Sequence, residues 1–503
     1  MAETFQPPRI IAQSVVLGGV VLGLGPLFWF AVSRGGLQTL QFDNGIFDVL
    51  LFTLKQAGLS TLLSVLPGML VARALARQDF WGHAWLLRLL AIPSALPAIV
   101  VVIALSSIYG RSHLLGDWFN LYGINGILLA HVFFNLPLAT RLFYEASETI
   151  PPENFRLAAE LSFNDFQVFR HVEWPVFRNI LPRISALIFL LCAASFAIVL
   201  TLGGPTATTL EVAIYQSLRL DFDIGRALCL SLLQVILCLG LVFLSGRMML
   251  QNITHATSHL FQRRFDGRDL VSRSADLTII FLATILVVPP LGALVINGVA
   301  QIHFGLPLFQ ALLTSFVIGT LTAITTIFIA WPMAQTETWL SQSTALAALI
   351  VPPAVMATGW FLLLENLSEN TVFVYATIVF LNLLMALPFS AAILAPAFAH
   401  EAKMHRNLCR ELDVSSWNKF RRIDLPMLRR PLIQAILLAF ILSFGDLTAI
   451  TLLGNQGIVT LPSLIQLQMG NYRQNDAAGT ALILALLSFS FAWMAQYLGS
   501  ADD

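Results

Sequence analysis

Charged residues are scarce in this sequence, where Asp, Glu, Lys and Arg make up 11% of 503 residues. A soluble domain carries about a quarter charged residues. An ionised side chain facing hydrocarbon costs on the order of several kcal/mol, so membrane-embedded chains avoid it. With 57% hydrophobic residues, this composition excludes an ordinary soluble protein and indicates a chain that lies mostly in the lipid bilayer. The formal net charge of zero gives no basic field that would favour a nucleic-acid partner.

Motifs of catalysis, nucleotide binding and metal binding are also missing. The sequence contains no HExxH, no GxSxG and no GxxxxGK[ST] loop. Its four cysteines form no CxxC pair and have no metal-ligand spacing, so we expect them to be small packing residues. We therefore expect a protein that is not an enzyme and binds no metal or cofactor. Any ATP hydrolysis must come from a partner subunit.

Long apolar segments fill the rest of the chain. A helix needs about 20 apolar residues to cross the bilayer core. We predict an all-α, polytopic membrane protein with about 12 transmembrane helices, arranged as two tandem six-helix permease halves. The predicted spans are 10–32, 50–76, 88–109, 124–144, 183–202, 225–249, 276–299, 309–333, 344–364, 371–398, 432–453 and 477–499.

Lys and Arg gather in the even-numbered loops between these spans, whereas the odd-numbered loops are poor in them. The positive-inside rule places such loops in the cytoplasm, so both termini are predicted to be cytoplasmic. The predicted domains are a first permease half at 1–250, a cytoplasmic linker at 251–275 and a second half at 276–503. Each half contains one long cytoplasmic loop, at 145–183 and at 399–431.

These two long loops match each other. Aligning Pro175 with Pro426 gives an offset of 426 − 175 = 251 residues, about half the chain, which indicates an internal duplication. The matched pairs are Leu157 and Leu408, Glu160 and Glu411, Leu161 and Leu412, Phe166 and Trp417, Phe169 and Phe420, Arg170 and Arg421, and Val172 and Ile423.

Each loop is predicted to form a short helix, a break and a second short helix. Ser162 and Asp413 mark the breaks, and both residue types can cap a helix N-terminus. In each copy two aromatic residues after the break share one helical face, and Pro175 or Pro426 is expected to end or redirect the second helix. Such an apolar face can dock in a groove of another protein; the alternative is a helix lying on the membrane surface. Two matched copies favour docking.

The spacing resembles the EAA loop of bacterial ABC-importer permeases, E-A-A-x-x-G-x9-I-x-L-P. Here the copies read LAAELS and LCRELD, then nine residues, then VEWP and IDLP; the usual leading Glu is Leu, and the usual Gly is Ser162 or Asp413. In that family this coupling loop seats in a groove of the ATPase subunit. The resemblance implies ATPase contacts at Glu160, Leu161, Ser162, Phe166, Phe169, Arg170, Pro175, Glu411, Leu412, Asp413, Trp417, Phe420, Arg421 and Pro426.

Further segments resemble the fused thiamine permeases, with ferric-iron permeases as the next relatives. They include YG..GILLAHVFFNLP from Tyr122, LTLGGPTATT from Leu200 and LSFGD from Leu442. The resemblance implies an inner-membrane importer of thiamine, and of thiamine phosphates, that works with two ATPase subunits using ATP and Mg and with a periplasmic thiamine-binding protein. A ferric-iron or polyamine permease is the alternative, and a secondary transporter is a more distant one.

Five residues are candidates for the translocation pathway. Asp446 is an acid within an apolar run; such residues line cavities or pair with neighbouring helix ends, and both readings stay open. A carboxylate suits thiamine, which carries a fixed positive charge. His131 and Asn135 lie one turn apart on one predicted span, where a packing role is favoured. Tyr215 and Gln216 belong to an outer loop and could gate the cavity or simply pack.

Overall fold

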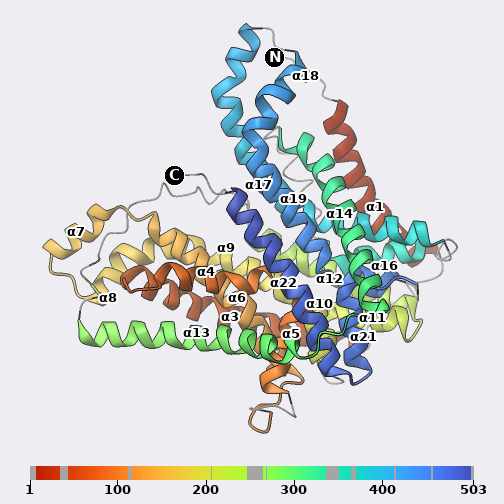
Figure 1. Ribbon diagram of the computed structural model, residues 1–503, viewed down its shortest axis with the longest axis horizontal. Coiled ribbons are helices and arrows are strands. Elements are labelled where there is room, and N and C mark those ends of the chain that lie inside the picture. The colour runs from red at the N-terminus through yellow and green to blue at the C-terminus, as the bar shows by residue number, and fades with distance from the viewer. Residues whose placement is uncertain are drawn as a thin grey trace. The chain divides into compact units, whose positions relative to one another are not determined.

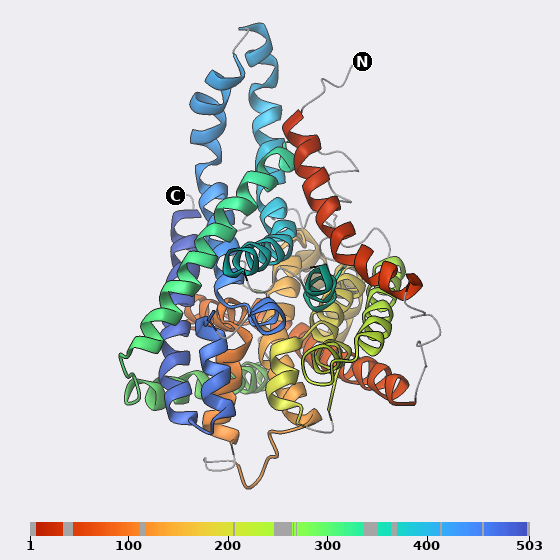
Figure 2. The same cartoon turned by 90° about the vertical axis from the view of Figure 1, so that its right-hand side faces the viewer.

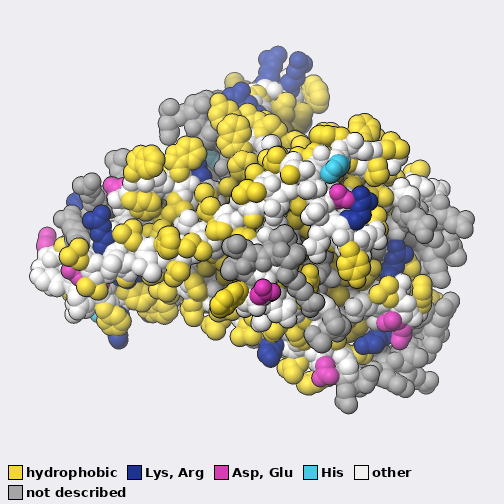
Figure 3. Space-filling view, turned by 60° about the horizontal axis from the view of Figure 1, so that its bottom comes forward, with side chains coloured by type: hydrophobic (Ala, Val, Ile, Leu, Met, Phe, Trp, Pro, Cys, Tyr) yellow, Lys and Arg dark blue, Asp and Glu magenta, His cyan; other side chains and the backbone are white. Residues whose placement is uncertain are grey.

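The computed structural model describes residues 7–33, 44–110, 116–204, 207–245, 264, 266–267, 269–335, 351–363, 370–412, 415–454 and 457–499. Within these residues the secondary structure is helical, with no strand. The prediction of an all-α protein is confirmed. Hydrophobic side chains cover much of the face drawn in Figure 3, and charged ones form only small groups on it.

The chain divides into two compact units. Unit 1 comprises residues 1–42, 211–235 and 298–503, and unit 2 comprises residues 43–210 and 236–297. The predicted halves, 1–250 and 276–503, were defined by the sequence duplication and stay a prediction.

Unit 2 is built around three packed helices, α3, α6 and α9. In Figure 1 the long helix α13 runs alongside this group. The helices are α3 (Asn44–Arg77), α4 (His83–Ala95), α5 (Ala98–Tyr109), α6 (Ile124–Glu148), α7 (Pro152–Glu160), α8 (Asp165–Val168), the π-helical turn η1 (Phe169–Glu173), α9 (Trp174–Ala193), α10 (Phe196–Leu202) and α13 (Leu270–Val299).

Unit 1 is built around α14, α17 and α19, which pack on one another. Figure 2 shows α17 and α19 rising side by side, with α18 and a second π-helical turn, η3, connecting them. The helices are α1 (Pro7–Ser33), α11 (Leu210–Arg219), α14 (Leu306–Ala334), α16 (Pro353–Leu363), α17 (Thr371–Glu411), α18 (Ser416–Lys419), η3 (Phe420–Asp424), α19 (Leu425–Phe444), α20 (Thr448–Leu453), α21 (Leu461–Gly470) and α22 (Gln474–Gly499). Helix α12 (Ile224–Ser245) contributes residues to both units.

Ten of the described helices are long and apolar enough to cross a membrane, and an eleventh span arises if α4 and α5 count as one. This number approximately supports the twelve predicted. The predicted span 88–109 is not straight, because α4 and α5 meet at an angle of 112°. Leu96 is extended there and Pro97 follows it, and a residue before proline is disfavoured in helical geometry. Part of the predicted span 344–364 lies outside the described residues.

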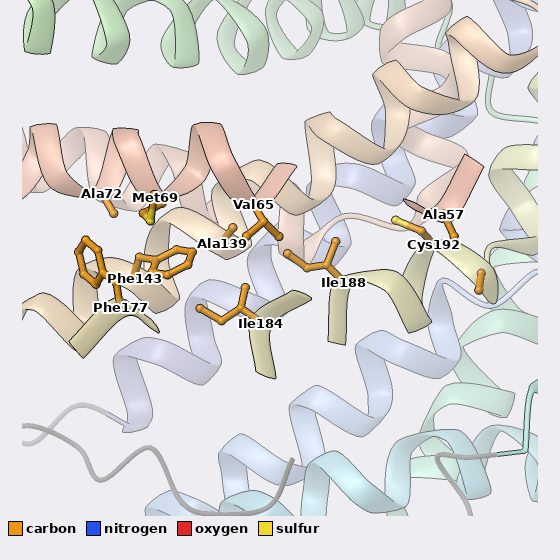
Figure 4. Close-up of a cluster of buried hydrophobic side chains, with 11 residues drawn as sticks. Ala57, Val65, Met69, Ala72, Ala139, Phe143, Phe177, Ile184, Ile188 and Cys192 are labelled. Carbon is orange, nitrogen blue, oxygen red and sulfur yellow. The ribbon is translucent and has the colours of Figure 1, made fainter. Parts of the chain in front are cut away.

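The core of unit 2 lies where α3, α6 and α9 meet, and Figure 4 shows its side chains. Phe143 and Phe177 pack edge to face there, with ring centroids 5.3 Å apart. Gly68 lies where α3 and α6 approach closely, because a Cβ at this position would lie 2.7 Å from the Cβ of Ala139. Small residues allow membrane helices to pack closely where no hydrophobic effect draws them together.

The duplication is visible in matching contacts within each unit. In unit 2, Asn135 of α6 donates a hydrogen bond to Cys192 of α9. In unit 1, Asn382 of α17 donates one to Ser443 of α19. Cys192 and Ser443 are related by the predicted offset, since 443 − 192 = 251. The donors Asn135 and Asn382 are 382 − 135 = 247 residues apart, about one helical turn out of that register, so the two three-helix groups join equivalent helices through shifted contacts.

Candidate functional site: the coupling loops and the buried carboxylates

The break in the first coupling loop (145–183) is a left-handed turn at Ser162. Its backbone φ is 52°, and the chain reverses as Phe163 N–H donates to the Ala158 carbonyl at 3.0 Å. This turn ends α7 in the way that glycine most often ends helices, because glycine has no Cβ to clash. The glycine of the family motif therefore has a structural reason, and Ser162 adopts the same conformation at some cost.

Asn164, and not Ser162, caps the second helix of this loop. Its side chain accepts a hydrogen bond from the Gln167 backbone at 2.8 Å, and the Gln167 side chain accepts one from the Asn164 backbone at 2.9 Å. This reciprocal capping box satisfies two N–H groups that the helix itself cannot. The predicted capping role of Ser162 is wrong, because its left-handed backbone closes the preceding helix. Asp413, its counterpart in the second coupling loop (399–431), lies outside the described residues.

Pro175 and Pro426 do not end the second helix of their loops. The helical path continues through η1 into α9, and through η3 into α19. Trp174 N–H donates to the Phe169 carbonyl and Leu425 N–H to the Phe420 carbonyl, five residues back. A proline supplies no N–H and clashes with the carbonyl four residues before it, so the widened π-helical turn accommodates it. Each coupling loop thus continues into a membrane helix without a break in the helical path.

Both loops expose apolar side chains at equivalent positions. Phe166 is 65% exposed in the first loop, and Trp417 is 67% exposed in the second. Leu161 and Leu412 are exposed in the same way. We call Leu161 with Phe166, and Leu412 with Trp417, the two docking patches.

The second aromatic residue of each loop is turned inward. Phe169 packs near Trp174, with ring centroids 5.9 Å apart, and lies under the Arg73 guanidinium at 5.2 Å. Phe420 packs against Trp331 at 5.5 Å. The predicted single aromatic face is therefore divided between a solvent-exposed ring and a packed ring.

The remaining predicted ATPase contacts differ in exposure. Pro175 is half-buried. The exposed ones are Glu160, Arg170, Glu411, Arg421 and Pro426.

A buried carboxylate anchors the base of the first loop. Glu173 is completely buried, and it pairs with Arg73 of α3 at 2.6 Å and with Arg264 at 2.6 Å. Arg264 belongs to the predicted linker between the halves, and its guanidinium also lies 4.3 Å from the ring centroid of Phe155 in α7. A few residues of the linker are therefore fastened to the coupling loop.

Arg77 extends this cluster towards the start of α13. It pairs with Asp165 of α8 at 2.6 Å, with Asp266 at 3.5 Å and with Asp276 at 3.6 Å. Ser272 donates a hydrogen bond to Asp165. Burial alone would raise the pKa of Asp266, but hydrogen bonds from Arg264 and the nearby guanidinium charges outweigh it and lower that pKa. Asp266 is accordingly held as a carboxylate.

The second coupling loop is held at the equivalent position by a smaller group of ion pairs. Lys419 lies 3.3 Å from Asp424 and 3.5 Å from Glu401, and both acids are buried. Asp424 is the counterpart of Glu173, since 424 − 173 = 251. Both acids stand in the matched motifs VEWP and IDLP, and the motif spacing assigns them no role. The sequence signal for this anchor is an acid that occupies the same position in both copies of the loop.

Two of the pathway candidates take part in packing contacts within unit 2. His131 shares a hydrogen bond with Ser60 at 2.9 Å, and Asn135 bonds Cys192 at 3.3 Å. His131 and Asn135 are both buried. Their pathway role stays a prediction.

The other three candidates lie in unit 1. Asp446 occupies the break between α19 and α20, so the predicted span 432–453 is not one continuous helix. Its carboxylate accepts hydrogen bonds from Thr448 N–H and Ala449 N–H, both at 3.0 Å. Tyr215 and Gln216 are half-buried on α11. The described residues include no group of three or more His, Cys, Asp or Glu side chains able to hold a metal ion.

Ten apolar helices, a duplicated three-helix core and two matched loops define a multi-pass membrane permease of duplicated architecture. The chain is 39% identical to the Thiamine transport system permease protein ThiP of Escherichia coli (strain K12), over 96% of this chain and 94% of that relative. It is 38% identical to ThiP of Brucella abortus (strain 2308), over 96% and 95%, and 36% identical to ThiP of Haemophilus influenzae, over 100% and 99%. The chain belongs to this family of thiamine transport system permease proteins. No protein-family model matches the sequence.

Proposed function

We propose that this chain is the membrane-spanning subunit of an ABC importer that moves thiamine, and thiamine phosphates, into the cytoplasm. The observation that carries the proposal is identity of 36–39% over nearly the full chain to relatives named as thiamine transport permeases. Full-length identity at this level favours retention of both the architecture and the solute class.

The partners of the proposed importer are two ATPase subunits and a periplasmic thiamine-binding protein. Each docking patch combines an exposed leucine just after one helix with an exposed ring on the next short helix, an apolar surface that suits a groove in a partner, and there are two patches for two subunits. The sequence has no nucleotide-binding loop. ATP and Mg are therefore used by the ATPase partner, and this chain acts as a non-catalytic subunit without a cofactor.

The proposed mechanism is alternating access in the inner membrane, with both termini in the cytoplasm. ATP binding draws the two ATPase subunits together, and the coupling loops pass this movement to the membrane helices. The unbroken helical paths from η1 into α9 and from η3 into α19 support such a transfer, because a helix moves as a rigid rod. Opening towards the periplasm accepts the solute, and hydrolysis resets the transporter.

Reconstitution tests this proposal. The chain, its ATPase and its binding protein are placed in proteoliposomes, and uptake of labelled thiamine is measured with and without ATP. We expect ATP-dependent uptake that unlabelled thiamine phosphates reduce and that ferric iron and polyamines do not. Uptake by the chain alone, driven by an ion gradient, would instead identify a secondary transporter.

A further inference from the structure

The second short helix of the first coupling loop, α8, contacts the long helix α13 directly. Asp165 is the first residue of α8, and Ser272 lies in the first turn of α13. The Ser272 hydroxyl donates a hydrogen bond to the Asp165 carboxylate. Helix α13 is a candidate membrane span. The first coupling loop is therefore fastened to a second span, in addition to α9, into which it continues.

The end of α3 binds both of these helices. Arg77 donates a hydrogen bond at 2.6 Å to the same Asp165 oxygen that accepts from Ser272, and its guanidinium lies 3.6 Å from Asp276 of α13. Gln78 donates a further hydrogen bond to the Asp276 carboxylate at 2.8 Å. Arg77, Gln78 and Asp276 are buried. Helices α3, α8 and α13 thus meet in one connected polar group, which we call the joint: Arg77, Gln78, Asp165, Ser272 and Asp276.

The chain just before α13 is packed onto the end of α3. Arg77 donates a hydrogen bond to the Asp266 carbonyl oxygen, and Gln78 donates one to the Gly267 carbonyl oxygen at 3.1 Å. Gly267 lies so close to α3 that a Cβ at this position would be 2.9 Å from the Gln78 Nε2 atom. The start of α13 is therefore held by backbone contacts as well as by the side chains of the joint.

The second coupling loop is held in a different way. Its ion pairs stay within the loop, because Lys419 and its partners Glu401 and Asp424 all belong to it. The counterpart of Asp165 is Ser416, since 416 − 165 = 251, and this residue carries no charge. Helix α14, which corresponds to α3 in the three-helix group of unit 1, contains no Lys or Arg. The joint therefore distinguishes the first coupling loop from the second.

We propose that Asp165 is a positioning residue through which the first coupling loop moves α13, so that the ATPase at the first docking patch drives two spans, α9 and α13. This inference rests on the proposed function and names residues that carry its coupling. A movement of α8 displaces the Asp165 carboxylate. Arg77 and Ser272 follow, because the Arg77 side chain is only 3% exposed and losing a partner of a buried charge is costly. From α13 the chain passes into the last segment of unit 1.

The test uses the complete complex with ATPase and binding protein in proteoliposomes. Ser272→Ala removes the hydroxyl that joins α13 to Asp165, Ser272→Thr retains a hydroxyl there, and Asp165→Ala removes the other side of the contact. The matched control is Ser274→Ala, because Ser274 is exposed on the same helix and its hydroxyl bonds the Val271 carbonyl of that helix. For each variant we measure labelled thiamine imported, ATP hydrolysed, the Tm and pull-down of the ATPase.

We expect Ser272→Ala to lower the number of thiamine molecules imported per ATP hydrolysed at least about threefold, with the Tm and the pull-down of the ATPase retained. Ser272→Thr should keep most of the coupling, and Ser274→Ala should behave as the unaltered protein does. The double variant Asp165→Ala with Ser272→Ala should lose no more than Asp165→Ala alone, because both changes remove the same contact.

An unchanged ratio of import to hydrolysis in both Ser272→Ala and Asp165→Ala would overturn the proposal. Losses that multiply in the double variant would also overturn it, because the two residues would then act separately. A fall in Tm and in ATPase pull-down that accompanies the loss in Ser272→Ala would assign the contact a structural role and overturn the proposal as well. Absence of thiamine import by the unaltered complex would instead contradict the proposed function.

Discussion

Arg264 lies 2.6 Å from Glu173, and this ion pair joins the segment between the two predicted halves to the base of the first coupling loop. Both side chains are almost fully buried. The second loop uses Lys419 and Asp424 in the equivalent position, and Lys419 is one-third exposed. The two loops are therefore anchored with different strength.

Removing Arg264 should destabilise the chain. In Arg264→Met the buried Glu173 keeps only Arg73 as a partner, and a buried charge that loses a partner costs about 2 kcal/mol or more. Thermal unfolding of the purified chain in detergent should show a lower Tm than for Arg170→Met, which removes an exposed arginine of the same loop. Equal Tm values for the two variants would mean that the linker contact does not stabilise the loop.

The left-handed turn at Ser162 predicts opposite effects for two substitutions. Ser162→Gly removes a strain of about 1 kcal/mol, and Ser162→Val increases it, because a β-branched side chain fits this conformation poorly. Hydrogen exchange of the amides in 157–168 should slow in the glycine variant and accelerate in the valine variant. Identical exchange in both would show that the turn is not held in this conformation.

The docking patches should matter for assembly and not for folding. Phe166→Ala and Trp417→Ala each remove an exposed ring, so the Tm of the isolated chain should stay unchanged. Loss of a central aromatic contact costs about 2 kcal/mol, or roughly 30-fold in affinity for the ATPase. Pull-down of the ATPase measures this. Trp118→Ala is the control, because Trp118 is also exposed but belongs to a loop predicted on the opposite side; a similar loss there would contradict the assignment.

Acid should release the contact made by Asp266. A carboxylate with a lowered pKa in the folded state binds fewer protons there than in the unfolded state. Its stabilisation is therefore complete above its ordinary value of 3.8 and is lost as the pH falls below it. We expect the Tm difference between the unaltered chain and Asp266→Asn to be constant above about pH 5 and to shrink below about pH 4. A Tm difference that grows as the pH falls would contradict the lowered pKa of Asp266.

Two glycines of α3 should respond differently to alanine. In Gly68→Ala the new Cβ would lie 2.7 Å from the Cβ of Ala139 and 3.1 Å from the Leu136 carbonyl oxygen, so the backbones must separate. Such overpacking costs about 1–3 kcal/mol. Gly58→Ala meets nothing within 4 Å and should be neutral or stabilising, because alanine favours the helix. The Tm of each variant in detergent tests this, and an equal loss of Tm in both variants would contradict the close packing at Gly68.

Some structural features follow directly from sequence pattern. The apolar segments predicted ten of the helices that could cross a membrane, because length and hydropathy are properties of the chain itself. The offset that matched Phe166 with Trp417 also relates Cys192 to Ser443 in the structure. A repeated sequence packs its equivalent helices in equivalent ways.

Other features could not be read from local pattern. Pro175 was expected to end or redirect a helix, yet a π-helical turn carries the helix through it. That outcome goes with the contacts that Phe169 and Glu173 make with Arg73 of α3, a residue far away in sequence. The bend between α4 and α5 likewise has a local cause in Pro97 but an angle that only packing decides.

The sequence by itself determined the membrane location, the helical class, the duplication and the positions of the two loops, because these depend on hydropathy, charge and spacing along the chain. Tertiary structure alone decided which polar residues meet. Glu211 lies between two predicted spans, where an acid is expected to be exposed, but α11 buries it. Arg264 belongs to the predicted linker, where a charged residue is expected to face solvent. In the structure it pairs with Glu173, which lies 264 − 173 = 91 residues earlier. Burial and ion pairing arise between segments distant in the chain, so no local pattern carries them.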